Sequence, residues 1–113
     1  MSRINERAVD EAPLLQLEGD LRTLYGDSAF FEAVVRCVGE GHRFIFADLS
    51  KVRNADAAGL GALVRARNLL AEVGGELQLI NPNGFVRELL RVTGLDTVIR
   101  IAPATPPEWM DGS

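Results

Sequence analysis

The sequence predicts a single α/β domain with a mostly parallel sheet of four to five strands and helices packed on it. Strand and helix patterns alternate along the chain, and their connections are short enough for right-handed crossovers. The 113 residues, 47% of them hydrophobic and 25% charged, suit one modest core. We expect residues 13–102 to form the domain, residues 1–12 to form either an edge strand or a mobile tail, and residues 103–113 to form a flexible tail.

Four segments of the domain have the pattern of strands. Leu14 to Leu17 is the first of them, and a turn follows it. Residues 44–47 are continuously apolar, which predicts a central parallel strand covered on both faces, followed by a linker at residues 49–55. Residues 76–80 alternate between polar and apolar types, and residues 97–101 complete the sheet as a short last strand.

Three amphipathic helices are predicted between these strands, each with apolar residues at intervals of three and four. The three stripes are Phe30, Phe31, Val34, Val35 and Val38; Leu60, Leu63, Ala66, Leu70 and Val73; and Phe85, Val86, Leu89, Leu90 and Val92. Asp27 or Ser28 is expected to cap the first helix, and Asp56 the second. For the third helix we expect Asn81 as the cap, with Pro82 at the first helical position.

Composition excludes several classes of function. A net charge of -4 argues against nucleic-acid binding, which needs clustered Lys and Arg. No apolar run reaches the ~20 residues of a membrane span, and the start of the chain is polar, so we expect a cytoplasmic protein with no direct membrane insertion. Cys37, expected at a half-buried helix position, has no cysteine to pair with, and His42 is the only histidine. We therefore expect no metal and no cofactor.

Catalytic constellations are scarce, because no nucleophile has an obvious base beside it and no P-loop is present. The pair Gly59 and Gly61 suggests a dinucleotide-binding loop, but the third glycine of that pattern is replaced by Val64. We therefore expect no catalytic residues and no enzyme activity.

The segment from Asp56 to Gly61 places a carboxylate and small residues at the N-terminus of a helix, just beyond a buried strand. Such a position offers free backbone N–H groups and suits capping, anion binding or close docking of another protein. From these residues alone the simpler interpretation is preferred. In it, Asp56 caps the helix and the small residues let the helix pack on its own sheet.

Several strings together resemble the signature of STAS-domain anti-sigma factor antagonists. In chain order they are Leu17 to Leu21, Asp48-Leu49-Ser50, Asp56-Ala57-Ala58-Gly59-Leu60-Gly61, Gly74-Gly75-Glu76-Leu77 and Thr93-Gly94-Leu95. Each string alone is weak, but the ordered set with its spacing is specific and runs through most of the chain. The resemblance implies a STAS-like fold and a partner-binding surface made by Asp20, Asp56, Ala57, Ala58, Gly59, Leu60 and Gly61.

The resemblance also implies a mechanism. In that family the motif is typically Asp-Ser-Ser-Gly-Leu-Gly, and an anti-sigma factor that is a histidine-kinase-like ATPase phosphorylates the second serine, which breaks the complex. Here Ala57 and Ala58 take both serine positions, and Ala58, at the position of the phosphorylated serine, has no hydroxyl to accept a phosphate. Ser50 and Thr93 are the remaining hydroxyls near the motif strings, and the simpler interpretation makes them a turn residue and a helix-end residue.

Three hypotheses for function stay open at this point. The first is a regulatory antagonist that binds its anti-sigma factor without a phosphorylation switch. The second is a structural STAS subunit, either seated on the transporter ATPase of a lipid-transport ABC complex or acting as a scaffold among other STAS proteins in a stressosome-like assembly. The third is a degenerate copy that competes with a phosphorylatable paralogue. Fold alone does not choose between them.

Overall fold

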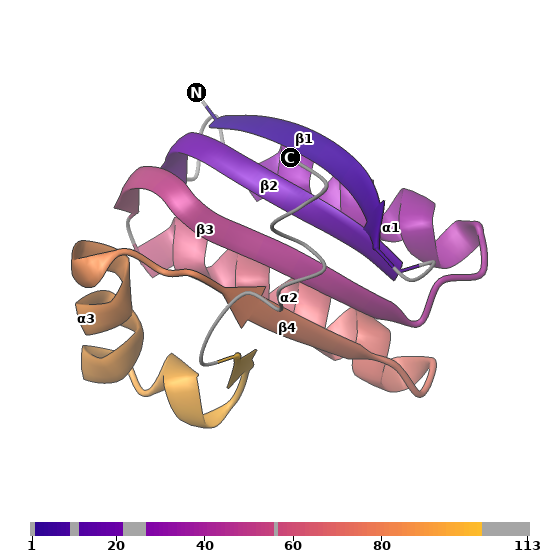
Figure 1. The fold of residues 1–113 in the computed structure, drawn as a ribbon. Helices are drawn as coiled ribbons and strands as arrows, with labels where there is room; N and C mark the ends of the chain where they lie inside the picture. The colour runs from indigo at the N-terminus through magenta and orange to yellow at the C-terminus, as the bar shows by residue number, and fades with distance from the viewer. Residues whose placement is uncertain (1, 10–11, 22–26, 56, 103–113) are drawn as a thin grey trace.

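The structure is a computed structural model that describes residues 2–9, 12–21, 27–55 and 57–102, with side chains for 12–19, 29–55 and 59–102 (Figure 1). The elements in chain order are β1 (Ser2–Val9), β2 (Ala12–Leu21), α1 (Asp27–Gly39), β3 (Phe44–Ala55), α2 (Ala57–Glu72), β4 (Glu76–Ile80), α3 (Gly84–Val92), the 3-10 turn η1 (Leu95–Thr97) and β5 (Arg100–Ile101). The flexible tail expected at residues 103–113 lies outside the described residues.

The five strands form one sheet in the order β1-β2-β3-β4-β5. The pairs β2–β3, β3–β4 and β4–β5 are parallel, whereas β1 is antiparallel to β2. The expected α/β fold with a mostly parallel sheet is therefore confirmed. Of the two alternatives for the start of the chain, residues 2–9 form a strand at the edge of the sheet.

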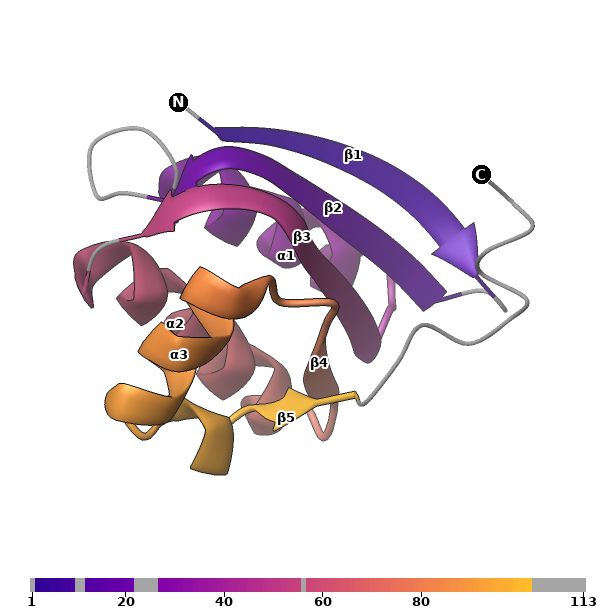
Figure 2. The same ribbon diagram turned by 60° about the vertical axis from the view of Figure 1, so that its left-hand side comes forward.

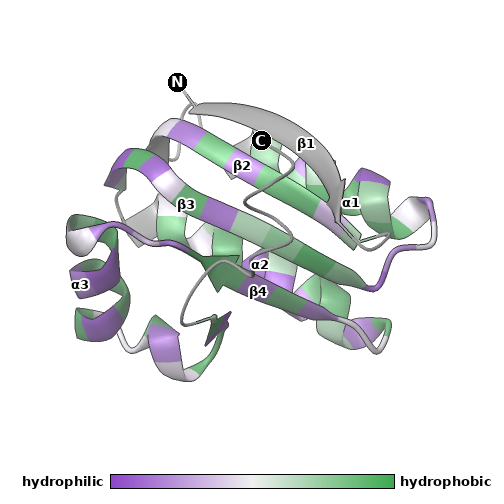
Figure 3. Ribbon diagram, in the orientation of Figure 1, coloured by the Kyte–Doolittle hydropathy of each residue, from purple (hydrophilic) through white to green (hydrophobic). Residues whose placement is uncertain are grey.

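The helices pack on one side of the sheet, with α1 and α2 side by side behind it and α3 at one end (Figures 1 and 2). The core lies between these layers, and Figure 3 shows hydrophobic residues concentrated in β2 to β4 and α2. Its fully buried side chains include Leu15, Leu17, Phe30, Val34, Ile45, Leu49, Leu63, Leu70, Leu77, Leu79, Val86 and Leu90. Cys37, expected to be half-buried, is also fully buried in this core.

Strand β3 differs from its prediction in two ways. Residues 49–55, expected to be a linker, continue the strand to Ala55. The pairing of β2 with β3 shifts register between Gln16 and Glu18 and again between Gly19 and Asp20, so the alternation that marks a strand is interrupted there. The strand is also not covered on both faces, because Phe44 keeps 56% of its surface exposed. A continuous apolar run therefore overstated the coverage of this strand.

The cap of α3 is Asn83, not Asn81. The Asn83 side chain accepts a hydrogen bond from the backbone N–H of Val86 at 3.0 Å, which is the bond of an N-cap. Asn81 instead has a φ of 52°, a left-handed conformation that asparagine tolerates better than most residues. Pro82 consequently precedes the helix and does not occupy its first turn.

The last strand is shorter than residues 97–101. The turn after α3 continues as η1, because the backbone N–H groups of Val98 and Ile99 both donate to the carbonyl of Leu95, at 3.0 and 2.9 Å. Gly94 allows this turn with a φ of 77°. Only Arg100 and Ile101 remain to pair with β4.

Four residues of the predicted helical stripes are exposed instead of buried. They are Val35 on α1, Val73 on α2, and Phe85 and Val92 on α3. Each lies at the margin of its apolar stripe, and a helix buries only the part of a stripe that a neighbouring element covers. The periodicity therefore predicted the helices correctly and overstated their buried faces.

Candidate functional site

The candidate site lies at the edge of the sheet where β2 and β3 end. The two strands are parallel and in register near that edge, with Asp20 opposite Asn54 and Leu21 opposite Ala55. Helix α2 begins two residues later, at Ala57. The fold thus brings the backbone of Asp20 close to the start of α2, as expected for the carboxyl ends of neighbouring parallel strands.

The described part of the helix start has a buried side and an open side. Leu60 is 2% exposed and packs in the core with Leu63, so it holds the first turn of α2 against the sheet. A Cβ added to Gly61 would meet no atom within 4 Å, so the backbone of this residue borders open space. Gly59 is buried. The core therefore holds one side of the helix start in place through Leu60, and the helix is accessible at Gly61.

Some of the predicted site residues cannot be placed in the same detail. Asp56 lies outside the described residues, and so do the side chains of Asp20, Ala57 and Ala58. Their backbone positions, where described, agree with the arrangement above: Asp20 ends β2, and Ala57 and Ala58 open α2. The role of Asp56 as a helix cap stays a prediction.

Asn83 is a structural residue of this region that the sequence analysis missed. Its side-chain amide donates to the backbone carbonyl of Val52, while its carbonyl oxygen accepts from Val86. These two bonds tie the start of α3 to β3 shortly before that strand ends. In the sequence, the signal for this cap is the spacing of three residues from Asn83 to Val86. Asn81, two positions earlier, fits the apolar period of the helix equally well as a cap.

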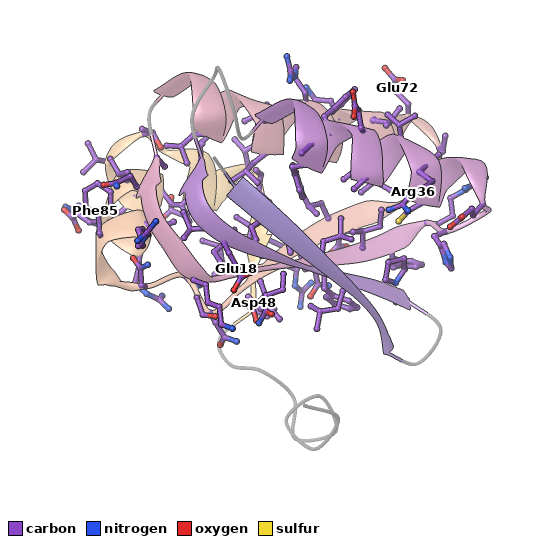
Figure 4. The ribbon with its side chains drawn as sticks, turned by 90° about the horizontal axis from the view of Figure 1, so that it is seen from above. Glu18, Arg36, Asp48, Glu72 and Phe85 are labelled. Carbon is purple, nitrogen blue, oxygen red and sulfur yellow. The ribbon has the colours of Figure 1, made fainter. Side chains whose placement is uncertain are left out.

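Asp48, in the first of the strings that resemble the antagonists, is a buried carboxylate with 7% exposure. Its Oδ1 accepts from the backbone N–H of Ser50 at 2.9 Å, and its Oδ2 accepts from Gln16 Nε2 at 3.4 Å. Figure 4 shows Asp48 and Glu18 on the face of the sheet opposite α1 and α2. Asp48 thus holds the backbone of β3 at the point where its register with β2 first shifts.

The hydroxyls of Ser50 and Thr93 have different surroundings. Thr93 ends α3, and its Oγ1 donates to the carbonyl of Leu89 at 2.7 Å, which is the arrangement of a helix-end residue. Ser50 is exposed on β3, so the turn expected there is not formed. Neither residue belongs to the start of α2.

The clearest electrostatic perturbation among the described residues lies on α3. The Arg91 guanidinium donates to the Glu88 carboxylate and holds the pKa of that carboxyl below its ordinary value, against a smaller opposing effect of desolvation. The same bond raises the pKa of Arg91. In the described ranges, no group of three or more His, Cys, Asp or Glu side chains could hold a metal ion, and no helix is long and apolar enough to cross a membrane.

Comparisons with known proteins agree with this geometry. The family described as Mlab, STAS domain, matches residues 4–101. A Thermotoga maritima protein named as a candidate anti-sigma factor antagonist is 33% identical over 64 residues, and a Thermotoga neapolitana homologue matches equally well. The matched segment spans 57% of this chain and 57% of the length of each relative.

Solved structures extend the similarity over nearly the whole chain. The crystal structure of a candidate anti-sigma factor antagonist from Thermotoga maritima has a TM-score of 0.82 and 27% identity, and the match covers 96% of this chain and 92% of that one. The antagonist SpoIIAA in its unphosphorylated form has a TM-score of 0.72 and 19% identity over 97% and 96% of the two chains, so it shows the fold alone.

The matched structures therefore share the fold of the mostly parallel sheet and the helices packed on it. The chain belongs to the STAS domain family. Within that family it is a protein similar to the anti-sigma factor antagonists.

Proposed function

We propose that this protein is a regulatory antagonist that binds an anti-sigma factor of the histidine-kinase-like ATPase type through the start of α2. The observation that carries the proposal is the helix start itself, where Leu60 is buried and Gly61 borders open space. Small residues at this position let a second protein approach the helix closely. The protein acts by binding in the cytoplasm, with no catalytic step of its own.

We further propose that this antagonist lacks the phosphorylation switch. The resemblance to the Asp-Ser-Ser-Gly-Leu-Gly motif puts Ala58, which has no hydroxyl, at the position of the phosphorylated serine. A phosphate would add about two negative charges at the helix start, beside Asp56. Without it, binding is controlled by the amount of protein present or by a further partner.

The test is an affinity capture of partners from the native cell extract, with and without ATP, followed by mass spectrometry. The proposal predicts recovery of a histidine-kinase-like anti-sigma factor, binding that does not change with ATP, and no phosphate on the captured antagonist. Recovery of a transporter ATPase or of other STAS proteins instead would place the protein in the structural class.

Two substitutions at position 58 sharpen the test. Ala58→Glu introduces charge where a phosphate would sit and is expected to abolish binding. Ala58→Ser supplies a hydroxyl and is expected to bind normally without ATP, then to gain one phosphate and dissociate when ATP is added. Ala71→Glu, at an exposed position near the other end of the same helix, is the matched control and is expected to bind normally.

A further inference from the structure

Helix α3 carries an apolar strip that the protein itself leaves uncovered. Phe85 and Val92 are seven positions apart, close to two turns at about 3.6 residues per turn, and therefore lie on one side of the helix. Their exposed fractions are 52% and 67%, and Leu89, between them on the same side, is only partly buried. Val86 and Leu90 face the core instead. We call Phe85, Leu89 and Val92 the α3 strip.

The α3 strip lies at the same end of the molecule as the candidate site. Figure 1 shows α3 at the end of the sheet where β3 ends and α2 begins, and Figure 4 shows Phe85 projecting outward from that end. The bond from Asn83 to the Val52 carbonyl fixes α3 to β3 just before the strand leads into α2. This bond thus links the helix that carries the strip to the strand that precedes the helix start.

We infer that the α3 strip is a second contact for the same protein that binds the start of α2, and that this partner presents an apolar surface to it. The inference rests on the proposed function. The charged neighbours Glu88 and Arg91 pair with each other, so they do not require opposite charges from the partner. Exposed apolar side chains rimmed by paired charges have the composition of an interface contact.

The size of the strip argues against a second copy of this chain as its occupant. A stable dimer buries about 1,200 to 2,000 Å² in total, roughly 20 residues or more on each side. Three side chains on a helix of nine residues, Gly84–Val92, supply far less than this. The strip is of the right size to extend an interface centred on its neighbour, the start of α2.

The experiment measures the affinity of the full chain for the purified histidine-kinase-like anti-sigma factor of the same organism by titration calorimetry. Phe85→Ala is expected to weaken binding at least tenfold, as aromatic anchors of interfaces do, and Val92→Ala severalfold. Phe44→Ala and Val73→Ala are the matched controls. These two residues are 56% and 38% exposed, lie at the opposite end of the sheet and helices, and are expected to change affinity less than twofold.

The outcomes separate this inference from the proposed function. If Ala58→Glu abolishes binding while Phe85→Ala binds like Phe44→Ala, the strip is not a contact and the proposed function stands. If Ala58→Glu leaves binding intact, the shared surface is overturned whatever Phe85→Ala does. Alanine is tolerated well in a helix, so we expect Phe85→Ala to fold. An unchanged thermal midpoint would show that weaker binding is not caused by unfolding. Sedimentation that shows a dimer broken by Phe85→Ala would assign the strip to a second copy and overturn the inference.

Discussion

The side chain of Asn83 joins two segments that are 31 residues apart, because its amide donates to the carbonyl of Val52 while its oxygen caps α3. One residue thereby satisfies a strand carbonyl and a helix N–H at the same time. The bond to Val52, together with the burial of Val86 and Leu90 in the core, fixes the position of α3 relative to β3.

Replacement of Asn83 tests this double role. Asn83→Ala removes both bonds and is expected to lower the free energy of unfolding by about 2 kcal/mol, from a lost cap of about 1 kcal/mol and a lost hydrogen bond of similar size. Asn83→Ser keeps a cap acceptor and loses the bond to Val52, so its loss should be smaller. Urea denaturation measures both. Equal losses in the two variants would show that the cap contributes nothing.

Two glycines are expected to respond oppositely to alanine. In Gly75→Ala the new Cβ would lie 2.0 Å from the backbone oxygen of Arg43, so the backbone must move and the protein should be clearly destabilised. In Gly61→Ala the Cβ meets open space inside a helix, so the free energy of unfolding should rise by up to about 1 kcal/mol. Thermal unfolding of the two variants checks both directions, and destabilisation by Gly61→Ala would contradict the open surface described for α2.

Protonation of Glu88 should be visible at acid pH. Its pKa is lowered in the folded protein by the bond from Arg91, so the contribution of the pair is present above the unfolded pKa and is lost as pH falls through the folded value. The NMR titration of the Glu88 carboxyl should give a pKa below its ordinary value, and Arg91→Gln should return it toward that value. Because both groups are exposed, we expect the effect on stability to be small.

The single cysteine reports on opening of the core. Cys37 is fully buried on α1, so a thiol reagent should leave the native protein unlabelled and react fully in denaturant. Labelling in the native state should therefore proceed only through unfolding. Labelling of folded protein as fast as that of the denatured chain would contradict the buried position.

Much of the fold could be predicted from the sequence because its signals are local. The apolar period located the three helices, and the alternation of elements predicted the parallel sheet. What could not be predicted depends on neighbours. The full length of β3 was not predicted, because its register shifts interrupt the alternation of polar and apolar residues. The exposure of Phe85 depends on which elements pack beside α3, and the apolar period does not contain that information.

The candidate site was predictable to a similar extent. Parallel strands place their carboxyl ends together, so the approach of Asp20 to the start of α2 follows from the topology. The small residues of the helix start were assigned to a binding surface only by the family resemblance. Their residue types alone favoured the simpler interpretation, in which they let the helix pack on its own sheet. The local spacing fits two asparagines, and the structure shows that Asn83 makes the cap bond and also bonds to the distant strand β3.

The register shifts of β3 have one more consequence. Between the pairs Gln16–Asp48 and Asp20–Asn54, β3 contains two more residues than β2 over the same length of sheet. Side chains alternate along a strand, so deleting a single residue there would turn every later side chain of β3 to the opposite face. The position at which α2 leaves the sheet thus depends on the number of residues in this stretch of β3 as well as on their types.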